Sequence, residues 1–343
     1  MKLKNKLKVF LVKVFHFEYW PFWIFYIPMY FYGLYLAFRA RSFMYFSATN
    51  PGMKYGGVMG ESKFGILKAM PGKYLPKTVF IAGGSPYCSI IHSLTSAGLI
   101  YPLVMKPDVG ERGKDVEIIR DEPSLKSYLA DKAFDLIAQE YINYDLEFGM
   151  LYHRMPGSSK GEVTSVVQKG FLTVTGDGTS ALRELISGSV RASGRQEYLY
   201  NKFADQLEKV LPLGHRMRLE PIGNHCRGTI FYNANHLINP LLHDVFNRIS
   251  LDIEGFFYGR FDLKVPSIDD LYHGRNIKIM ELNGVSSEAA HVYDPDYKIV
   301  RAYKDIARHM KIIYRIAKKN HDLGVKYAPP GQFLNELRQY LIR

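Results

Sequence analysis

The sequence predicts an α+β fold of two or three subdomains, preceded by an aromatic helical segment at the N-terminus. Three observations support this prediction. At 343 residues, the chain is long enough to enclose a large core in more than one subdomain. Strand-like and helix-like stretches alternate from residue 79 onward. Residues 1–45 differ in composition from the rest, because lysines and then aromatic residues dominate them.

The N-terminal segment has two parts. Up to Val14, apolar residues recur at helical spacing among lysines, which is typical of a basic amphipathic helix. From Tyr19 to Phe38 no residue is charged, and eleven of these twenty residues are aromatic. The run is long enough to span a bilayer, but Pro21 and Pro28 interrupt a straight helix and aromatic rings prefer the interface. We expect a membrane-associated segment that spans the bilayer, re-enters it or lies at its interface. We also expect this segment to be separable from the rest of the chain. The alternative is a buried helix of a soluble core.

The charge and cysteine content narrow the class of protein. The net charge is +12 and the pI is near 9.4, so nucleic acid, an anionic membrane surface or anionic substrates are all conceivable partners. Basic residues gather near both termini, including a predicted helix over 298–319, without a nucleic-acid reading motif. We therefore expect an anionic membrane surface and no nucleic acid. Cys88 and Cys226 lack CxxC spacing, which indicates neither a disulfide framework nor a zinc site.

Between residues 46 and 142 the chain alternates loops, helices and short strands. Residues 46–100 form a linker with a helical run over 62–70, a strand over 79–82 and a helix over 89–97. A strand over 101–107 then ends near Lys106 and is followed by Gly110 and Gly113. Glycines after a strand free backbone N–H groups to surround phosphate oxygens, although a lysine before a glycine turn is also common elsewhere.

Residues 118–186 continue the mixed pattern. Strand signals over 136–142 and 148–152 flank an acidic, aromatic stretch between Glu140 and Glu147 that also fits a solvated hairpin. Residues 153–162 are polar and rich in glycine and serine, which is typical of a mobile flap. A strand then leaves through Gly176–Gly178 into a helix over 180–186.

Two polar strands farther along predict a metal site. Arg260 and Asp262 alternate on one strand and project to the same side, and Glu281 and Asn283 do so on a second strand. If the two strands are neighbours, two carboxylates and an amide oxygen converge. Hard oxygen ligands of this kind suit Mg2+ held against nucleotide phosphates, and an arginine suits an anionic group in transfer. A hairpin with polar residues on its solvent face is the alternative.

The ordered set of motifs resembles the ATP-grasp superfamily, in particular the D-alanine D-alanine ligase and cyanophycin synthetase branches. The motifs are MKPDVGERGKDV, AQEYINYDLEFGM, QKGFLTVTGDGTSALRELI, GRFDLKV and IMELNG, and the resemblance covers roughly residues 60–300. It implies an ATP-grasp fold, in which two α+β subdomains clamp ATP. It also implies a ligase that makes an acyl phosphate, which an amine attacks with release of ADP and phosphate.

The resemblance also implies roles for individual residues. It implies ATP with two Mg2+ ions as cofactors. Lys106 and Lys169 would bind the phosphates, under a lid that contains Gly110, Arg112 and Gly113, and Lys63 would be a weaker nucleotide contact. Glu140, Tyr141 and Ile142 would contact the adenine, and Glu147 would contact the ribose. Asp262, Glu281 and Asn283 would hold Mg2+, Arg260 would act with Lys106 in catalysis, and Ser286, Ser287 and Glu288 would lie near the substrate.

The predicted organisation has five regions: 1–45, the amphipathic and aromatic membrane-associated segment; 46–100, the linker and a reduced N-terminal subdomain; 101–180, the small lid subdomain; 181–300, the Mg2+ and substrate subdomain; 301–343, C-terminal helices. The predicted function is a membrane-associated ligase at the cytoplasmic face of a bacterial-type inner membrane, acting on small-molecule or lipid-linked carboxylate and amine substrates. The alternatives are a kinase or a ligase with a non-amine acceptor, and a catalytically silent ATP-binding scaffold. Neither substrate can be carried over, because the ligases' larger first domain and their Pro-Gly turn after the asparagine are both missing.

Overall fold

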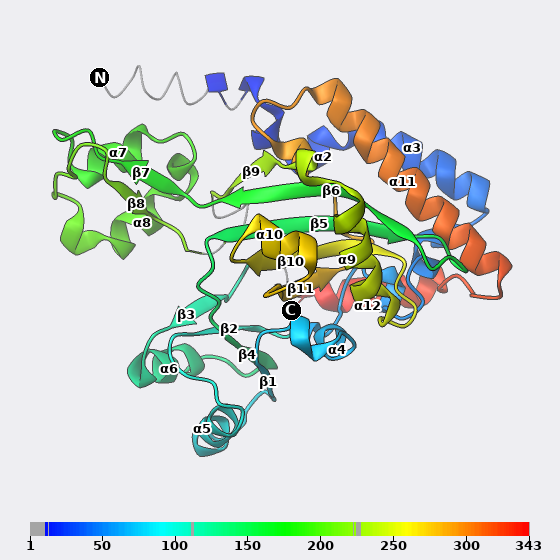
Figure 1. Cartoon of the computed structure of the whole chain (residues 1–343), viewed down its shortest axis with the longest axis horizontal. Helices are drawn as coiled ribbons and strands as arrows, with labels where there is room; N and C mark the ends of the chain where they lie inside the picture. The colour runs from blue at the N-terminus through cyan, green and yellow to red at the C-terminus, as the bar shows by residue number, and fades with distance from the viewer. Residues whose placement is uncertain (1–10, 13, 111–112, 222, 224–227, 343) are drawn as a thin grey trace.

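The computed structural model describes residues 11–12, 14–110, 113–221, 223 and 228–342. Most of the expected amphipathic helix, and Arg112, lie outside these residues. The fold is α+β, with a central five-stranded sheet, a smaller four-stranded sheet and a third small unit (Figure 1). The expected α+β class is therefore present.

The central sheet has the strand order β11-β10-β5-β6-β9, with every neighbouring pair antiparallel. Its strands are β5 (Leu146–Arg154), β6 (Gly161–Gly170), β9 (Ile230–Asn233), β10 (Tyr258–Val265) and β11 (Lys278–Asn283). Successive residues of β5 face opposite sides: Met150 and Tyr152 pack in the cluster that includes α9, whereas Leu151 packs in the cluster that includes α11. Both faces of this sheet are thus covered, which explains the continuous apolar run in β5.

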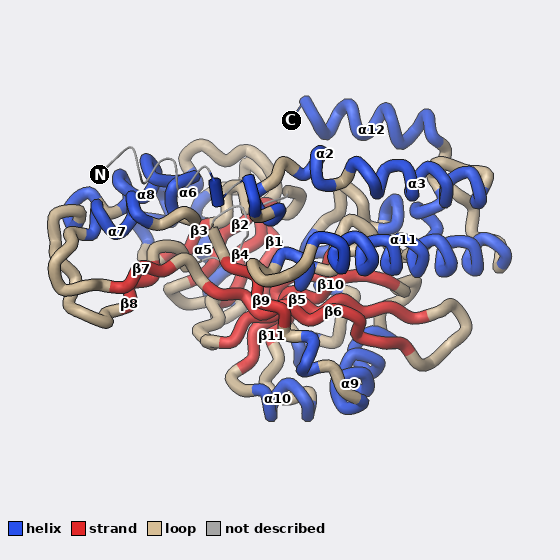
Figure 2. The backbone as a smooth tube through the Cα atoms, turned by 90° about the horizontal axis from the view of Figure 1, so that it is seen from above, coloured by secondary structure: helices blue, strands red, loops and turns tan. Residues whose placement is uncertain are grey.

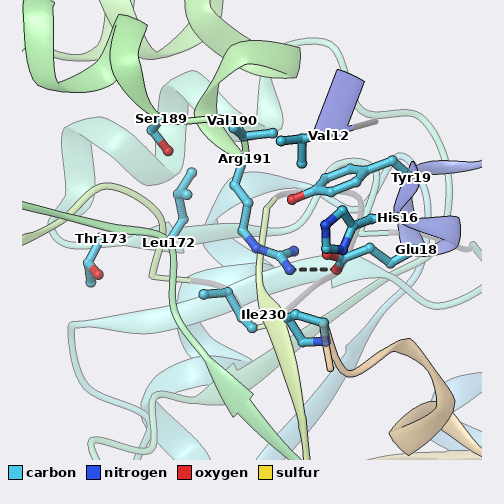
Figure 3. A pocket seen from close by; sticks show the side chains of 11 residues that line it. Val12, His16, Glu18, Tyr19, Leu172, Thr173, Ser189, Val190, Arg191 and Ile230 are labelled. Carbon is cyan, nitrogen blue, oxygen red and sulfur yellow. Dashed lines mark hydrogen bonds and ion pairs between the residues drawn. The ribbon is translucent and has the colours of Figure 1, made fainter. Parts of the chain in front are cut away.

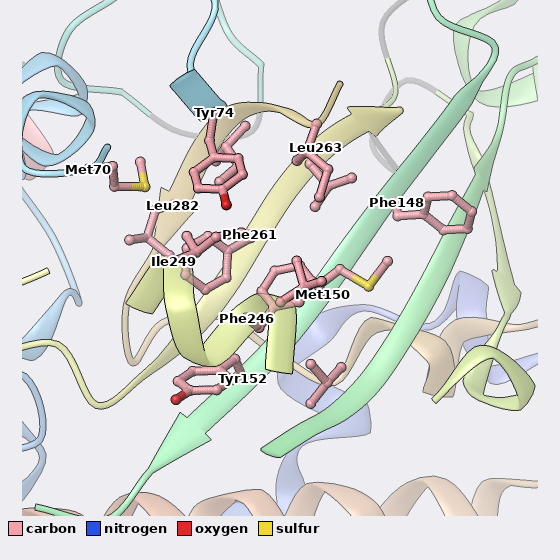
Figure 4. Packing of buried hydrophobic residues seen from close by; sticks show 14 of the residues in the cluster. Met70, Tyr74, Phe148, Met150, Tyr152, Phe246, Ile249, Phe261, Leu263 and Leu282 are labelled. Atoms are coloured by element: carbon pink, nitrogen blue, oxygen red, sulfur yellow. The ribbon is translucent and has the colours of Figure 1, made fainter. Parts of the chain in front are cut away.

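One face of the central sheet carries the largest apolar cluster. Helices α9 (Pro240–Leu251) and α10 (Ile268–His273) supply part of it. Phe246 of α9 meets Phe261 of β10 edge to face, with ring centroids 5.3 Å apart, and Phe148, Met150 and Tyr152 extend the cluster along β5 (Figure 4). Side chains of this size each stabilise the fold by about 1.5–3 kcal/mol on burial. This layer therefore fixes the strands that carry the polar residues of the site.

The smaller sheet has the order β1-β4-β2-β3 and is also antiparallel. Its strands are β1 (Thr78–Ile81), β2 (Leu103–Pro107), β3 (Glu117–Ile119) and β4 (Leu136–Glu140), and helices α5 (Tyr87–Ser96) and α6 (Glu122–Leu129) cover it. Helix α6 begins after Asp121, whose carboxylate accepts a hydrogen bond from the backbone N–H of Ser124 at 2.8 Å, as in a capping box.

A third unit is inserted between β6 and β9. It contains β7 (Thr173–Thr175), α7 (Leu182–Gly188), α8 (Gln196–Lys202) and β8 (Arg216–Arg218), and it has a small core of its own. The sheets do not follow the expected ranges 101–180 and 181–300, because β5 pairs with β10 and β6 pairs with β5 and β9, so that both strands lie in the central sheet. The expected flap over 153–162 consists of the two strand ends and the turn of the β5–β6 hairpin.

The aromatic N-terminal segment forms η1 (Phe17–Tyr19), α2 (Phe22–Phe25) and α3 (Ile27–Ala40). Pro21 and Pro28 lie at helix starts, where a missing N–H group costs little, so they divide the segment without kinking a helix. Helix α3 lies beside α11 (Ile299–Asp322) (Figures 1 and 2). Among the residues that the structure describes, no helix is both long enough and apolar enough to cross a bilayer.

The packing of this segment corrects the expectation that it is separable. Phe25 and Leu36 are buried in one cluster with Ile313 of α11, and the Phe25 ring stacks on Tyr303 with centroids 5.2 Å apart. The expected basic helix over 298–319 is α11, and its apolar stripe is what α3 covers. One face of the segment therefore belongs to the core, so removal of residues 1–45 exposes the apolar stripe of α11.

The remaining elements are short or peripheral. These elements are η2 (Tyr45–Ala48), η3 (Lys54–Gly56), α4 (Lys63–Lys68), η4 (Gly72–Tyr74), η5 (Ala192–Arg195), η6 (Ala204–Gln206), η8 (Asn235–Leu237), η9 (Ala290–Tyr293) and α12 (Pro330–Ile342).

Asn50 joins the linker to the start of β10. Its side chain is fully buried; Oδ1 accepts hydrogen bonds from the backbone N–H groups of Phe257 (2.8 Å) and Tyr258 (2.9 Å). Its Nδ2 donates to the carbonyl oxygens of Gly56 (2.9 Å) and Tyr258 (2.8 Å). All four positions of the amide are used, which is the arrangement that a buried amide requires.

We predict that Asn50→Asp lowers the free energy of unfolding by about 2 kcal/mol or more, because two buried carbonyls lose their donor and face an acceptor. Urea unfolding followed by circular dichroism measures the change. The control is Asn335→Asp on the exposed surface of α12, for which a change within about 0.5 kcal/mol is expected. Equal stability of the two variants would show that the Asn50 contacts do not stabilise the fold.

Candidate active site

A cleft of about 770 Å³ lies between the small and the central sheet and extends to the N-terminal segment. Sixteen of the residues singled out from the sequence line it, from positions as far apart as Lys63 and Glu288. They are Lys63, Lys106, Gly110, Gly113, Glu140, Tyr141, Ile142, Glu147, Lys169, Arg260, Asp262, Glu281, Asn283, Ser286, Ser287 and Glu288. Arg112 lies outside the described residues.

A network of buried charges forms the floor of the cleft. In the β10–β11 pair, Asp262 lies opposite Glu281 and Arg260 opposite Asn283, so the two strands are neighbours as their spacing predicts. Arg260 donates from Nε and Nη2 to the two carboxylate oxygens of Asp262, both at 3.1 Å. This two-pronged pair orients the guanidinium toward the cleft.

Lys169 of β6 connects this pair to β5. Its Nζ lies 3.0 Å from Glu147 and 3.4 Å from Asp262. Burial alone would lower the pKa of Lys169, but the Asp262 and Glu147 carboxylates outweigh it, and the pKa lies above its ordinary value. Burial likewise opposes ionisation of Asp262, yet Arg260 and Lys169 hold its pKa below the usual range. Each buried charge is therefore retained only because its partners are present.

Lys106 is held differently, because its closest partners are neutral. Its Nζ donates to Gln139 Oε1 at 3.2 Å in the small sheet and to the Met280 carbonyl at 3.1 Å in β11. Burial lowers the pKa of Lys106 to about 8. Nearby, Lys63 donates to the carbonyl of Gly110 at 2.5 Å, so it holds the loop after β2. Lys106 thus bridges the two sheets and offers a cation that an anionic ligand would stabilise.

The charged residues of the cleft that were not singled out from the sequence are Glu18, Glu61, Lys114 and Lys264. Lys264 lies on the same face of β10 as Arg260 and Asp262, and it donates to the Ile142 carbonyl at 2.9 Å. The period of two along β10 was the signal that could have identified it. Burial raises the pKa of Glu61 to about 7, and its Oε1 has no hydrogen-bond partner among the described residues. No sequence pattern marks Glu61.

The donor set on β10 and β11 fits Mg2+ bound together with phosphates. Two carboxylates on paired strands and an amide oxygen are hard ligands, and Mg2+ commonly takes its remaining ligands from phosphate and water. No group of three or more His, Cys, Asp or Glu side chains suited to a metal occurs within the described part of the chain. The protein ligands for a metal at this position would be two carboxylates, Asp262 and Glu281, and the amide of Asn283.

The opposite end of the cleft is built by the N-terminal segment. Phe17, Trp20, Phe22 and Phe25 line it, next to the carboxyl group of Glu288. Tyr26 and Tyr293 donate their hydroxyl groups to the two oxygens of Glu288, the second at 2.5 Å. Burial raises the pKa of Glu288, and it raises that of Tyr26 and Tyr293 as well, so both phenols stay protonated donors. The role of Tyr26 was not foreseen from the sequence.

The loop after β11 is held by the linker. Backbone N–H groups of Val285 and Ser286 donate to the carbonyls of Gly56 (3.0 Å) and Gly57 (3.1 Å). A Cβ on Gly57, which has a φ of +93°, would lie 2.4 Å from Gly284 Cα. Two glycines in direct contact therefore set the position of Ser286, Ser287 and Glu288.

A second, smaller cavity of about 350 Å³ lies beside the third unit (Figure 3). Arg191 reaches across it to Glu18 of η1 and forms an ion pair. Tyr19 and Leu172 complete part of its wall. Because Glu18 lines both cavities, η1 is shared between the cleft and the third unit.

No protein-family model and no curated protein matches the chain. Among solved structures, it is similar to D-alanine–D-alanine ligase from Bacillus anthracis, with 14% identity and a TM-score of 0.42 over 77% of this chain and 69% of that one. A bifunctional glutathione synthetase from Pasteurella multocida has 13% identity and a TM-score of 0.40, over 75% of this chain and 36% of that one. The VanG D-Ala:D-Ser ligase from Enterococcus faecalis has 12% identity and a TM-score of 0.39, over 74% of this chain and 59% of that one. A D-alanine–D-alanine ligase, the class that the sequence motifs resemble, is thus among the structures found.

We predict that ATP binding at pH 8 takes up about half a proton, because Lys106 with a pKa of about 8 is half deprotonated in the free protein and a phosphate favours its charged form. Titration calorimetry in buffers of different ionisation enthalpy measures the uptake. Lys106→Arg, which stays charged, is the control and removes this contribution. If both proteins take up the same amount, Lys106 does not contact the phosphates.

Proposed function

We propose that the chain is an ATP-grasp enzyme, an ATP-dependent ligase that joins a carboxylate to an amine. The observation that carries the proposal is the arrangement of Arg260, Asp262, Glu281 and Asn283 on two paired strands in a cleft between two sheets. Lys106 and Lys169 lie on the same cleft. A concentration of cations and Mg2+ ligands suits phosphoryl transfer, which needs charge neutralisation and alignment more than covalent help from the protein.

The residues can be assigned to steps of this reaction. Lys106 and Lys169 bind phosphate oxygens, and Arg260 binds the phosphoryl group as it moves to the carboxylate oxygen and its bond to ADP breaks. The amine nitrogen then attacks the acyl carbon; the C–N bond forms, the C–O bond to phosphate breaks with its electron pair on phosphate, and the nitrogen loses a proton to solvent. Asp262, Glu281 and Asn283 would hold Mg2+, which neutralises phosphate charge when bound.

The nucleotide base would bind where β4 leaves the small sheet. Glu140, Tyr141 and Ile142 lie on the cleft there, and Glu147 lies at the start of β5. Glu140 accepts a hydrogen bond from the Lys77 N–H at 3.1 Å, and Glu147 is paired with Lys169. Glu140 is therefore preorganised by the backbone, whereas Glu147 would have to share its charge between Lys169 and ribose hydroxyls.

We predict that Glu281→Gln and Asp262→Asn lower ADP formation at least ~100-fold, the scale of losing one preorganised charge contact. The assay supplies ATP, Mg2+, hydroxylamine and a panel of amino-acid and fatty-acid carboxylates, and measures ADP and hydroxamate. Exposed Glu197→Gln is the matched control and keeps normal turnover. Arg260→Lys is expected to lose most activity, since a point charge lacks the planar two-pronged contact.

Four outcomes discriminate the alternatives. ADP with hydroxamate supports the ligase. ADP with a stable phosphorylated product and no hydroxamate indicates a kinase, and ATP binding without turnover across the panel indicates a scaffold. Release of AMP and pyrophosphate would mean adenylation, which contradicts the roles of Lys106 and Arg260.

We further propose that the outer face of the N-terminal segment binds an anionic membrane surface, such as the cytoplasmic face of a bacterial-type inner membrane. The exposed residues of α3 recur at helical spacing and form one apolar stripe: Ile27, Tyr30, Phe31, Leu34, Tyr35 and Phe38. Phe31 is 71% and Phe38 83% exposed, and Arg39 and Arg41 follow at the end of the helix. Aromatic residues beside basic ones are typical of an interfacial segment.

We predict that Phe31→Ser with Phe38→Ser weakens binding to phosphatidylglycerol vesicles at least ~10-fold, because both rings lose a burial that is worth more than 1 kcal/mol each. Cosedimentation measures the affinity. Exposed Leu251→Ser on α9, outside the N-terminal segment, is the control. Unchanged binding by the double variant would show that this stripe does not face the lipid.

A further inference from the structure

The end of the cleft that the N-terminal segment builds combines an apolar wall with the carboxyl group of Glu288, whereas the other acidic group of this segment, Glu18, is paired with Arg191. Phe17, Trp20, Phe22 and Phe25 supply the wall, and the Glu288 carboxyl group lies beside it on the cleft surface. Both oxygens of Glu288 accept hydrogen bonds from phenols, and no lysine or arginine among the described residues forms an ion pair with it. The positive charge of Arg260 favours ionisation of Glu288, but its guanidinium donates hydrogen bonds to both oxygens of Asp262 and not to Glu288.

A carboxylate in this setting selects a cationic ligand. Phenol hydrogen bonds stabilise the anion without neutralising it, and removal from water makes an unpaired anion costly. An ammonium group would pair with Glu288, whereas a second carboxylate would be repelled by it. The amine, more than the carboxylate substrate, therefore fits this end of the cleft.

The apolar wall continues to the molecular surface. Phe22 lines the cleft and is also 52% exposed, and the exposed stripe of α3 begins a few residues later at Ile27. No polar side chain of α2 interrupts the path, since its sequence is FWIF. A hydrocarbon chain could thus lie against the wall and leave past Phe22 toward the face that we assign to the membrane.

We propose that the amine acceptor is an amphiphile, a primary amine on a long hydrocarbon chain or lipid, whose ammonium binds Glu288 and whose chain lies on the aromatic wall. This inference rests on the proposed ligase function and deepens it, because it names the class of the acceptor. It also assigns the N-terminal segment a second task, since the wall residues of the segment whose outer stripe faces lipid would hold a membrane-borne substrate near the acyl phosphate.

The two tryptophans of the chain provide a local test. Trp20 lies on the cleft wall, and Trp23 is 63% exposed outside it. In Trp23→Phe, the fluorescence of Trp20 alone reports binding of dodecylamine, dodecanol, dodecanoate and butylamine, with dodecylamine and dodecanoate below their critical micelle concentrations and dodecanol below its solubility limit. Dodecylamine is expected to bind at least ~10-fold more tightly than the other three, the scale of one buried ion pair or several buried methylene groups.

Variants separate the cleft from the outer face. Glu288→Gln should remove the preference for dodecylamine over dodecanol and leave dodecanol affinity unchanged, while Phe31→Ser on the outer stripe should change neither. Equal affinity of the unmodified cleft for dodecylamine and dodecanol would overturn the acidic half of the proposal, and equal affinity for dodecylamine and butylamine would overturn the hydrocarbon half. Both comparisons use Trp23→Phe with Glu288 intact, so they hold even if Glu288→Gln does not fold.

A reaction arm distinguishes this inference from the ligase function. Hydroxylamine needs no chain and traps the acyl phosphate, so its hydroxamate reports the ligase chemistry alone. When hydroxamate forms, dodecylamine should replace it with an amide at concentrations at least ~10-fold below butylamine. Equal competition by the two amines overturns the acceptor class and leaves the ligase standing, whereas absent hydroxamate overturns the ligase while the Trp20 binding result stands by itself.

Discussion

The pairing of Arg260 with Asp262 on the face of β10 is the interaction on which the cleft depends. Lys169 and Glu147 extend it across β6 and β5, so charges from three adjacent strands compensate one another away from water. A shift of one residue in the β10 register would turn Arg260 and Asp262 toward the apolar layer of Phe246. The large apolar cluster beneath the sheet therefore fixes the register, and the register fixes the electrostatics.

The polar face of β10 and β11 could be predicted from the sequence because strand periodicity is local. Side chains two residues apart share a face wherever the strand lies, and the neighbouring strand needed only a short connection. Helix α11 and the strands β1, β2, β4 and β5 were also recognised from their patterns, with ends displaced by a few residues. The membership of β5 and β6 in the central sheet was missed, since it depends on the pairing of β5 with β10, more than a hundred residues later, and β6 joins the sheet through β5.

The N-terminal segment shows that amino-acid composition does not predict which face of a helix is buried. An uncharged aromatic run has the same composition whether it faces lipid, packs in a core or does both, and only the apolar stripe of α11 decides which face is covered. Tyr26 escaped notice for the same reason: its partner Glu288 is 262 positions away. Glu61 and the Glu18–Arg191 pair likewise arise from long-range packing, which a pattern of neighbours in sequence does not encode.

The contact between Gly57 and Gly284 limits how this chain can vary. Each glycine leaves room for the backbone of the other, so a side chain at either position displaces the loop that carries Ser286 and Glu288. A compensating change at the second position is not available, because glycine is already the smallest residue. Among natural variants with a working cleft, these two positions should stay glycine together.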